Sequence, residues 1–331
     1  MHLAIPAIGL ALLIATAAPA APASRYDIGA NLARLKARPV PAEWSFAVAG
    51  DSRGGLHVLE AVMGGIERSG AAFTVFTGDL VPESTTAYWD AALESLDRSV
   101  RNVPVFPVVG NHETYKEGIG RFLQAFGNPS PHAEGPIDYA FDYGGARFVM
   151  MDNSRSNPEG FTDAQMTWLD KQLAGAPALV FVAAHKPPYT ARWEHAFGNN
   201  AKRFMATLEK YKVTGALFGH IHFYDRADHG GVTYLIAGGA GAPLYHWDGD
   251  PDAGNPKFFA SPKGVKAHNY AIVTVKGKTA SFKVFTDQAK LAKLKPKRSA
   301  GIDLSPADFE LWDAGDFRAS ATAREAVPAG K

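Results

Sequence analysis

Short apolar runs that alternate with helical patterns are the feature that most constrains the fold, and the alternation begins at Trp44. The runs have the length of single strands, and apolar residues between them recur at helical spacing. Such alternation predicts layered α/β architecture. Several runs are apolar almost throughout, which predicts strands that are covered on both faces. The predicted strands span residues 44–49, 72–77, 104–109, 148–151, 178–184 and 214–218.

Three helices are predicted between these strands. Apolar residues recur at helical spacing over 59–66 and over 89–100, so each segment would bury one stripe. A third helix is predicted to begin at the capping box from Thr162 to Gln165, and Gly175 would end it. The methionines and aromatic residues of these stripes are therefore expected in the core.

Two β-hairpins are predicted from alternating apolar residues on either side of glycine turns. One spans 139–151 around a Gly-Gly pair, and the other spans 270–285 around a single glycine. Hairpins that join parallel strands would make the sheets mixed. Periodicity fades after the second hairpin, and residues 288–331 are predicted to form a basic, Ala-rich C-terminal tail.

Composition excludes several classes of function. The 331 residues include no cysteine, which excludes disulfide scaffolds, thiolate nucleophiles and cysteine-based zinc sites. The formal net charge is +1, so charge gives no reason to expect nucleic acid or an anionic membrane as a partner. The basic stretch over 290–298 is interpreted as a solvated strap, and no protein partner is inferred.

Residues 1–23 predict a signal peptide, which leaves 24–287 as one domain. An apolar run is followed by small residues that offer two small-x-small cleavage sites, ending at Ala20 and at Ala23. An uncleaved anchor is the alternative, but the run is shorter than the roughly 20 apolar residues of a spanning helix. A periplasmic or secreted protein without a stable membrane span is therefore predicted.

Polar residues suited to metal binding follow five of the predicted strands. The carboxyl ends of strands in an open α/β sheet are where ligands bind, and glycines before these residues permit sharp turns and close approach. A single Gly-Asp pair is usually a turn, and a lone histidine is usually a core residue, but five such motifs in order favour a site. The candidate ligands are Asp51, Asp79, Asn111, His185, His220 and His222.

The chemistry of this set points to a pair of metal ions. Two carboxylates, one amide and three imidazoles suit Fe, Mn or Zn. Two such ions roughly 3.5–4 Å apart can clamp a phosphoryl group and generate a hydroxide nucleophile. The sequence therefore predicts a metal-dependent phosphoesterase that acts on a small phosphorylated substrate.

The ordered motifs resemble those of the calcineurin-like metallophosphoesterases, including the purple acid phosphatases. The resemblance runs from about Trp44 to Phe285. It implies a four-layer αββα sandwich of two mixed β-sheets flanked by helices, and hydrolysis of a phosphomonoester by metal-bound hydroxide. The motifs, which begin at residues 50, 78, 110, 184 and 219, read GDSR, GDLV, GNHE, AHKPPY and GHIH.

The resemblance also implies a role for each candidate residue. The first Asp and the last His would bind one ion, the second Asp would bridge both ions, and the remaining three ligands would bind the other ion. His112 would protonate the leaving oxygen or stabilise the transition state. In chain order these roles fall to Asp51 and His222, to Asp79, and to Asn111, His185 and His220.

The first metal site departs from the family pattern. Arg53 stands where many members have a liganding histidine, and a guanidinium cannot ligate a cation. Pro82 stands where purple acid phosphatases have a liganding tyrosine. Three ligands plus solvent form a normal open catalytic shell, which Glu83 or His57 could supplement.

Substrate contacts are predicted around these ligands. Arg53 is hypothesised to bind the substrate phosphate and to assist catalysis, with a structural Arg–carboxylate pair as the alternative. Tyr189 and His195 lie in the loop after the fifth strand and could contact phosphate or leaving group. His246 and Trp247 are weaker candidates for the rim of the same pocket.

Two alternatives to a phosphomonoesterase stay open. One is a phosphodiesterase acting on cyclic nucleotides, lipid headgroups or nucleic acid, which an open groove would favour over a narrow pocket. The other is a non-catalytic metal- or phosphate-binding module, in which Arg53 marks lost turnover. The full set of His and Asp motifs weighs against the second alternative.

Overall fold

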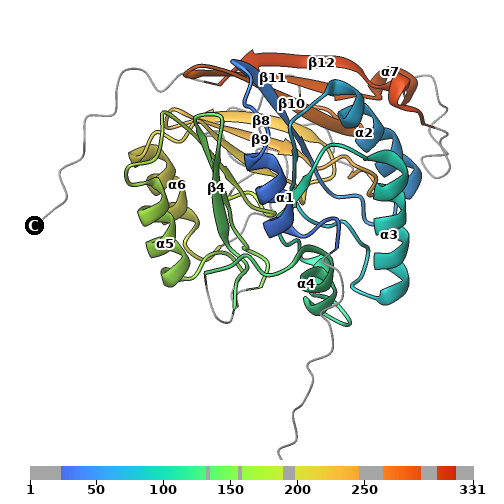
Figure 1. Cartoon of the computed structure of the whole chain (residues 1–331), viewed down its shortest axis with the longest axis horizontal. Coiled ribbons are helices and arrows are strands. Elements are labelled where there is room, and N and C mark those ends of the chain that lie inside the picture. Colours follow the sequence, from blue (N-terminus) through green and yellow to red (C-terminus); the bar gives the residue numbers. More distant parts are fainter. Residues whose placement is uncertain are drawn as a thin grey trace, which may run out of the picture.

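The computed structural model describes residues 24–131, 135–155, 159–188, 198–245, 264–291 and 304–317. The predicted signal peptide and four predicted pocket residues lie outside the described residues; the four are Tyr189, His195, His246 and Trp247. Two six-stranded sheets and the helices around them form the described part of the chain (Figure 1). The predicted α/β sandwich of two mixed sheets is confirmed.

The first sheet carries the strands that lead to three of the candidate ligands. Its members are β1 (Glu43–Ala49), β2 (Thr74–Phe76), β3 (Val105–Pro107), β10 (Asn269–Lys276), β11 (Thr279–Thr286) and β12 (Glu310–Asp316). Their order is β12-β11-β10-β1-β2-β3. β1, β2 and β3 run parallel, so their carboxyl ends meet at one edge of the sheet, whereas β10 pairs antiparallel with β1.

The second sheet brings the histidines to the same edge. Its members are β4 (Tyr139–Tyr143), β5 (Ala146–Met150), β6 (Leu179–Ala183), β7 (Gly215–Phe218), β8 (Tyr224–His229) and β9 (Val232–Ala237). Their order is β4-β5-β6-β7-β9-β8, with parallel pairing from β5 through β9 and antiparallel strands at both edges.

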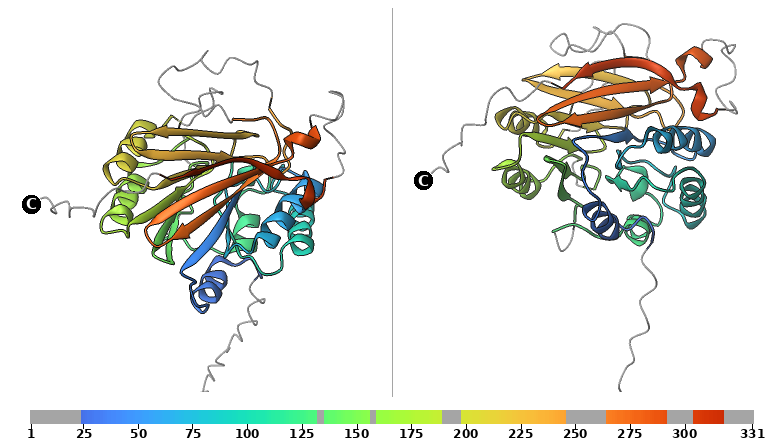
Figure 2. Two further views of the ribbon diagram at one scale, coloured as in Figure 1. Left: turned by 90° about the horizontal axis from the view of Figure 1, so that it is seen from above. Right: turned by 45° about the horizontal axis from the view of Figure 1, so that its top comes forward.

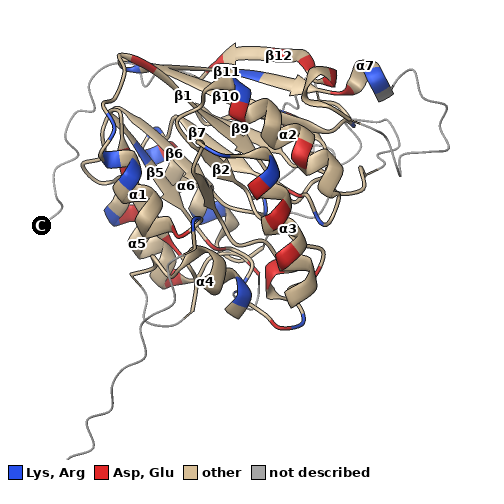
Figure 3. Cartoon of the chain, turned by 45° about the vertical axis from the view of Figure 1, so that its right-hand side comes forward, with Lys and Arg blue, Asp and Glu red and all other residues tan. Residues whose placement is uncertain are grey.

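Helices cover the outer faces of the two sheets. In Figure 1, α5 (Asp163–Leu173) and α6 (Ala201–Lys210) lie on one side, and α2 (Leu56–Ser69) and α3 (Thr86–Ser99) lie on the other. The remaining helices are α1 (Ile28–Lys36), α4 (Gly120–Phe126) and the short α7 (Gln288–Leu291). Basic and acidic residues are interspersed along these helices (Figure 3), as a net charge of +1 leads one to expect.

Aromatic side chains fill the space between the sheets. Phe46 of β1 meets Phe148 of β5 and Phe181 of β6 edge to face, with ring centroids 4.9 Å apart in both pairs. All three rings are buried. Such pairs contribute about 0.5–1.5 kcal/mol each beyond the burial of their area. The cluster therefore holds the two sheets together next to the edge where the ligands converge.

Each strand and helix predicted from apolar periodicity is present, and both hairpins form. The capping box is also confirmed, because the Thr162 side chain accepts from the Gln165 backbone N–H and the Gln165 side chain accepts from the Thr162 N–H. Beyond the second hairpin, where no strand was predicted, β12 pairs with β11 (Figure 2). None of the described helices combines the length and the apolar character that a bilayer crossing requires.

Candidate metal centre

Four residues of the predicted site adopt backbone conformations that side chains seldom take. The φ angles are 63° at Asp51, 40° at Arg53, 55° at Asp79 and 67° at His220. Each left-handed residue costs about 1–3 kcal/mol and persists only where its surroundings fix it. The strain is concentrated at the turns that follow β1, β2 and β7, which is where the ligand side chains must point inward.

Glycines beside these turns leave room for the ligands. A Cβ on Gly219 would lie 2.3 Å from Asp51 Oδ2, and a Cβ on Gly110 would lie 2.3 Å from Asp79 Oδ1. Real Cβ atoms do not approach backbone or carboxylate oxygens so closely. The glycines of the motifs therefore permit close approach between neighbouring strand ends.

Two overlapping groups of side chains could each hold one ion. The ligand atoms of each group lie within 4.8 Å of one another, and Asp79 belongs to both. One group joins Asp79 to His185 and His220, and the other joins it to Asp51 and His222. The Asn111 amide oxygen lies 3.0 Å from His185 Nε2, so it extends the first group. The six predicted ligands are thus brought together, with Asp79 between the two groups as a bridge requires.

Backbone carbonyls orient two of the imidazoles. His185 Nδ1 lies 2.7 Å from the Thr77 carbonyl oxygen, and His222 Nδ1 lies 2.8 Å from that of Pro243. An N–H on Nδ1 donates to the carbonyl in both cases, so Nε2 is the atom left to ligate. His185 must first lose its Nε2 proton, because its pKa is raised to about 9. His220 offers its Nδ1 instead, 3.2 Å from His185 Nε2.

Two of the three imidazoles of the cluster are neutral at pH 7, as metal ligands must be. Burial lowers the pKa of His220 to about 2 and that of His222 to about 4, so both imidazoles are neutral and available as ligands at pH 7. Burial raises the pKa of Asp51 well above its usual range, although His185 lowers it. Burial lowers the pKa of His185 but the Asp79 carboxylate outweighs it and raises the value to about 9. Protonated His185 thus supplies the positive charge that lowers the pKa of Asp79, and a divalent or trivalent ion would take over that role as the imidazole releases its proton.

The donor set therefore fits two metal ions without supplementary ligands. His57 is exposed on α2, and the nearest cation to Glu83 is Lys116, at 3.9 Å. Neither residue belongs to a group of possible metal ligands among the described residues. The suggestion that Glu83 or His57 supplements the first site gains no support from this geometry.

Glu113 is a buried part of the site to which the sequence analysis gave no role. Its carboxylate accepts from the backbone N–H groups of Asp79 and Leu80, both at 2.8 Å, and of Gly110, at 2.7 Å. Burial raises the pKa of Glu113 to about 7, and the Asp79 charge adds to this. The side chain ties the turn after β2 to the turn after β3. Its place two residues after Asn111, at the end of the GNHE motif, was the available signal.

His112 lies next to the bridging carboxylate and is not among the grouped ligands. Its backbone N–H donates to Asp79 Oδ1 at 2.9 Å, and its ring Nδ1 faces the Pro82 carbonyl oxygen. The other ring nitrogen, Nε2, lies 3.8 Å from Asp79 Oδ2. Burial lowers the pKa of His112. Its orientation leaves Nε2 as the atom that could exchange a proton with a bound substrate.

Arg53 and Tyr245 frame the group formed by Asp51, Asp79 and His222. Arg53 NH1 lies 3.5 Å from His222 Nε2, and no described carboxylate forms an ion pair with it. The Tyr245 ring stacks on the His222 ring with centroids 4.0 Å apart and planes inclined by 12°. Tyr245 was missed because it follows a Gly-rich stretch without periodicity. Its immediate neighbours in sequence are the predicted rim residues outside the described part.

Comparisons with known proteins agree with this geometry. Residues 45–224 match the family model for calcineurin-like phosphoesterases. The chain is 30% identical over 192 residues to Fe(3+)-Zn(2+) purple acid phosphatase 12 of Arabidopsis thaliana, which covers 51% of this chain and 40% of that protein. It is 25% identical over 235 residues to "Probable inactive purple acid phosphatase 1" of the same plant, and this match covers 58% of this chain and 38% of that protein. The chain thus spans less than half the length of these relatives.

A solved structure with a similar fold is purple acid phosphatase PPD1 from yellow lupin seeds. The TM-score is 0.63 at 17% sequence identity, and the match covers 85% of this chain and 55% of the lupin chain. At that level of identity the likeness concerns the fold alone. It supports the arrangement of two sheets in which the ligand cluster lies.

Proposed function

The chain belongs to the calcineurin-like phosphoesterase family, and from this membership and the ligand cluster we propose that it is a two-metal phosphatase acting on small phosphomonoesters. The observation that carries the proposal is the position of Asp79, which is shared by two groups of ligands whose donor atoms lie within 4.8 Å. When bound, the two ions would polarise the phosphoryl group and activate water. Fe, Mn and Zn all suit this donor set.

The side chains of the site would bind the ions, position the turns, transfer a proton and bind the substrate. The six ligands would hold the ions, and Glu113 would keep the turns that carry Asp79 and Asn111 in place. His112, once protonated at Nε2 as well as at Nδ1, would donate the Nε2 proton to the leaving oxygen. Arg53, which no described carboxylate pairs, would bind the substrate phosphate and offset the charge that develops on it. Tyr189 and His195 are proposed as further substrate contacts.

Metal analysis combined with two chromogenic substrates tests this function. We expect two ions per chain and turnover of p-nitrophenyl phosphate that Asp79→Asn abolishes. The matched control is Asp287→Asn, which alters another buried carboxylate bonded to a histidine, His268 Nδ1 at 2.7 Å, outside the ligand cluster. Faster turnover of bis(p-nitrophenyl) phosphate than of the monoester would instead identify a phosphodiesterase.

A non-catalytic binding module is the second candidate, because two relatives carry the word inactive in their names. Under this alternative, Arg53 in place of a ligand would mark lost turnover. Stable binding of metal without hydrolysis of either ester would favour it. Retention of both His112 and the complete ligand set favours the phosphatase.

We also propose that the protein is exported to the periplasm or secreted. The support is the sequence of residues 1–23, with its apolar run and two small-x-small sites. Mass spectrometry of the protein from a periplasmic or culture fraction tests this. A mature chain that begins after Ala20 or Ala23 is expected, and an intact Met1 in a cytoplasmic fraction would contradict the proposal.

A further inference from the structure

A pocket lined by arginines lies at the end of the first sheet opposite to the metal centre. Pro104 and Val105, at the start of β3, contribute to its lining, whereas the ligand Asn111 follows the carboxyl end of the same strand. Arginines from the start of the described chain, from α1 and its end, and from the loop before β3 surround it. These are Arg25, Arg34, Arg38 and Arg101.

Positive charge exceeds negative charge around this pocket. Arg25 pairs with Asp97 at 3.0 Å, but no described carboxylate forms an ion pair with Arg34, Arg38 or Arg101. Glu67 is engaged elsewhere, because it accepts from the backbone and side-chain amide nitrogens of Asn102. Like charges brought together without counterions repel one another, so this cluster is more stable with an anion bound.

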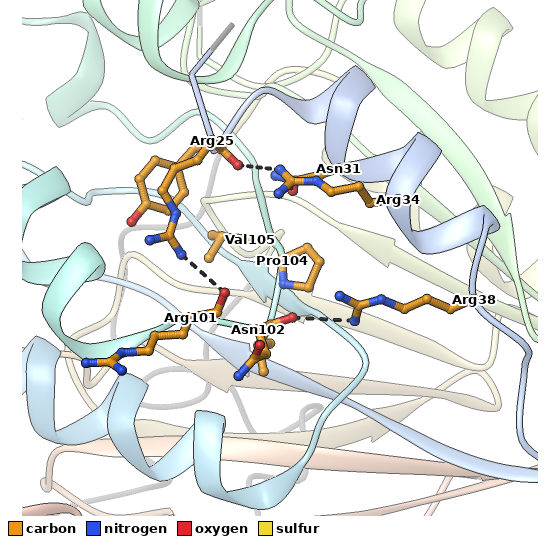
Figure 4. A pocket seen from close by; sticks show the side chains of 10 residues that line it. Arg25, Asn31, Arg34, Arg38, Arg101, Asn102, Pro104 and Val105 are labelled. Carbon is orange, nitrogen blue, oxygen red and sulfur yellow. Dashed lines mark hydrogen bonds between the residues drawn. The ribbon is translucent and has the colours of Figure 1, made fainter.

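The guanidinium groups are held so that they face the pocket. Arg34 donates to the Arg25 carbonyl oxygen at 2.7 Å and to Asn31 Oδ1 at 2.6 Å. Arg25 donates to the Val100 carbonyl oxygen at 2.7 Å. In Figure 4 the guanidiniums of Arg25, Arg34 and Arg38 surround Pro104 and Val105, whereas the Arg101 side chain extends away.

A buried amide provides a second, independent indication of a ligand. The Asn31 side chain lines the pocket and its residue is 2% exposed, yet its Nδ2 has no hydrogen-bond partner among the described residues. An unpaired buried donor costs about 1–3 kcal/mol. Asn31 Nδ2 itself has almost no accessible surface, so a shift of the side chain toward the pocket would let a bound anion accept from Asn31 as well as from the arginines.

We propose that this pocket binds a small tetrahedral oxyanion of the phosphate or sulfate class. The cavity volume is about 60 Å³, several times the roughly 10–15 Å³ that one water requires. Guanidinium groups match such oxyanions because their N–H groups fork onto two oxygens. The site lies apart from the metal centre and does not depend on the proposed phosphatase activity.

Calorimetric titration of the full chain with sulfate at constant ionic strength tests the proposal. We expect saturable binding that the double variant Arg34→Gln/Arg38→Gln weakens at least about tenfold. The matched control is Arg68→Gln/Arg203→Gln, which removes two arginines from α2 and α6 and should leave the affinity unchanged. Equal affinity in the pocket variant and the control would overturn the proposal.

Two further measurements distinguish loss of anion binding from unfolding of α1 in the double variant. Arg34→Lys/Arg38→Lys keeps both charges and should retain part of the affinity, with an unchanged circular dichroism spectrum. Crystals of the unaltered chain soaked in selenate should show an anomalous peak beside Asn31 Nδ2. A peak at the metal centre but none at this pocket would refute the site.

Discussion

Arg53 occupies a position where a ligand is expected, and its substitution separates substrate binding from metal binding. The guanidinium lies beside His222 without a carboxylate partner, so Arg53→Ala should leave metal content intact. We expect kcat/KM on a chromogenic monoester to fall about 10²–10³-fold, with Arg53→Lys intermediate, because an ammonium lacks the forked geometry. Arg68→Ala on α2 is the control. Unchanged kinetics in both Arg53 variants would remove Arg53 from the site.

His112 contacts Asp79 through its backbone N–H, so its side chain can be removed without breaking that hydrogen bond. His112→Ala keeps the N–H that donates to Asp79 Oδ1. We expect kcat to fall about 10²–10⁴-fold, the range for a lost general acid, at unchanged metal content. His57→Ala, at an exposed histidine on α2, should have no effect. Loss of an ion from the His112 variant would show instead that the ring supports the ligands.

A substitution at Gly219 tests whether Asp51, Asp79 and His222 hold a metal ion. A methyl group there would lie 2.3 Å from Asp51 Oδ2 and must displace the carboxylate. We therefore expect Gly219→Ala to lower the metal content from two ions to one per chain. Gly120→Ala, where a Cβ meets nothing within 4 Å, is the control. Two ions retained with normal affinity would mean that Asp51 is not a ligand.

At the scale of elements, Gln165 fastens α5 to the β4–β5 hairpin. Besides completing the capping box, its Nε2 donates to Asp138 Oδ1 at 3.0 Å and to the Asp152 carbonyl oxygen at 2.7 Å. Gln165→Ala leaves these buried acceptors short of a donor, so we expect it to lower the free energy of unfolding by about 2 kcal/mol. Gln172→Ala, farther along the same helix, should change it by less than about 0.5 kcal/mol. Urea titration measures both.

Several elements with a clear apolar pattern could be predicted from sequence, whereas α1, α6 and β9 were missed and the polar edge strands give no such pattern. β6 is buried throughout and reads as an unbroken apolar run, whereas α2 buries one face and shows helical spacing of its apolar residues. β8 reads YDRADH, and in β12 only Asp313 is buried, so neither edge strand shows apolar alternation. These strands are held by backbone pairing with β9 and β11, which depends on residues distant in sequence.

The ligand cluster could be predicted because each ligand directly follows a strand within a recognisable motif. Glu113 and Tyr245 acquire their places only through tertiary contacts. Glu113 accepts N–H groups from two different turns, and Tyr245 stacks on a ring more than twenty residues away in sequence. The basic pocket likewise joins α1 to the loop before β3, which no local pattern indicates.

For the whole molecule, a buried pair of aspartates should make stability depend on pH. Burial raises the pKa of Asp138 and that of Asp152 to about 7. Arg155, whose NH1 lies 4.0 Å from Asp152 Oδ2, offsets this only in part. Between pH 4 and 7 the folded chain therefore binds more protons at these groups than the unfolded chain does. The contribution of these two carboxyl groups to the free energy of unfolding should fall as pH rises through this window.

Replacing one of the two aspartates by asparagine should make the free energy of unfolding depend less on pH. Asparagine resembles the protonated aspartic acid, so Asp152→Asn should reduce the loss of stability between pH 4 and 7 by on the order of 3 kcal/mol. Asp142→Asn, in the same hairpin, removes a carboxylate whose pKa is lowered by its hydrogen bond to Arg147, and the slope over this window should persist. Urea titrations at a series of pH values, with metal content held constant, measure the difference. A slope that survives Asp138→Asn and Asp152→Asn alike would mean that both carboxylates ionise in the folded chain as they do in the unfolded one.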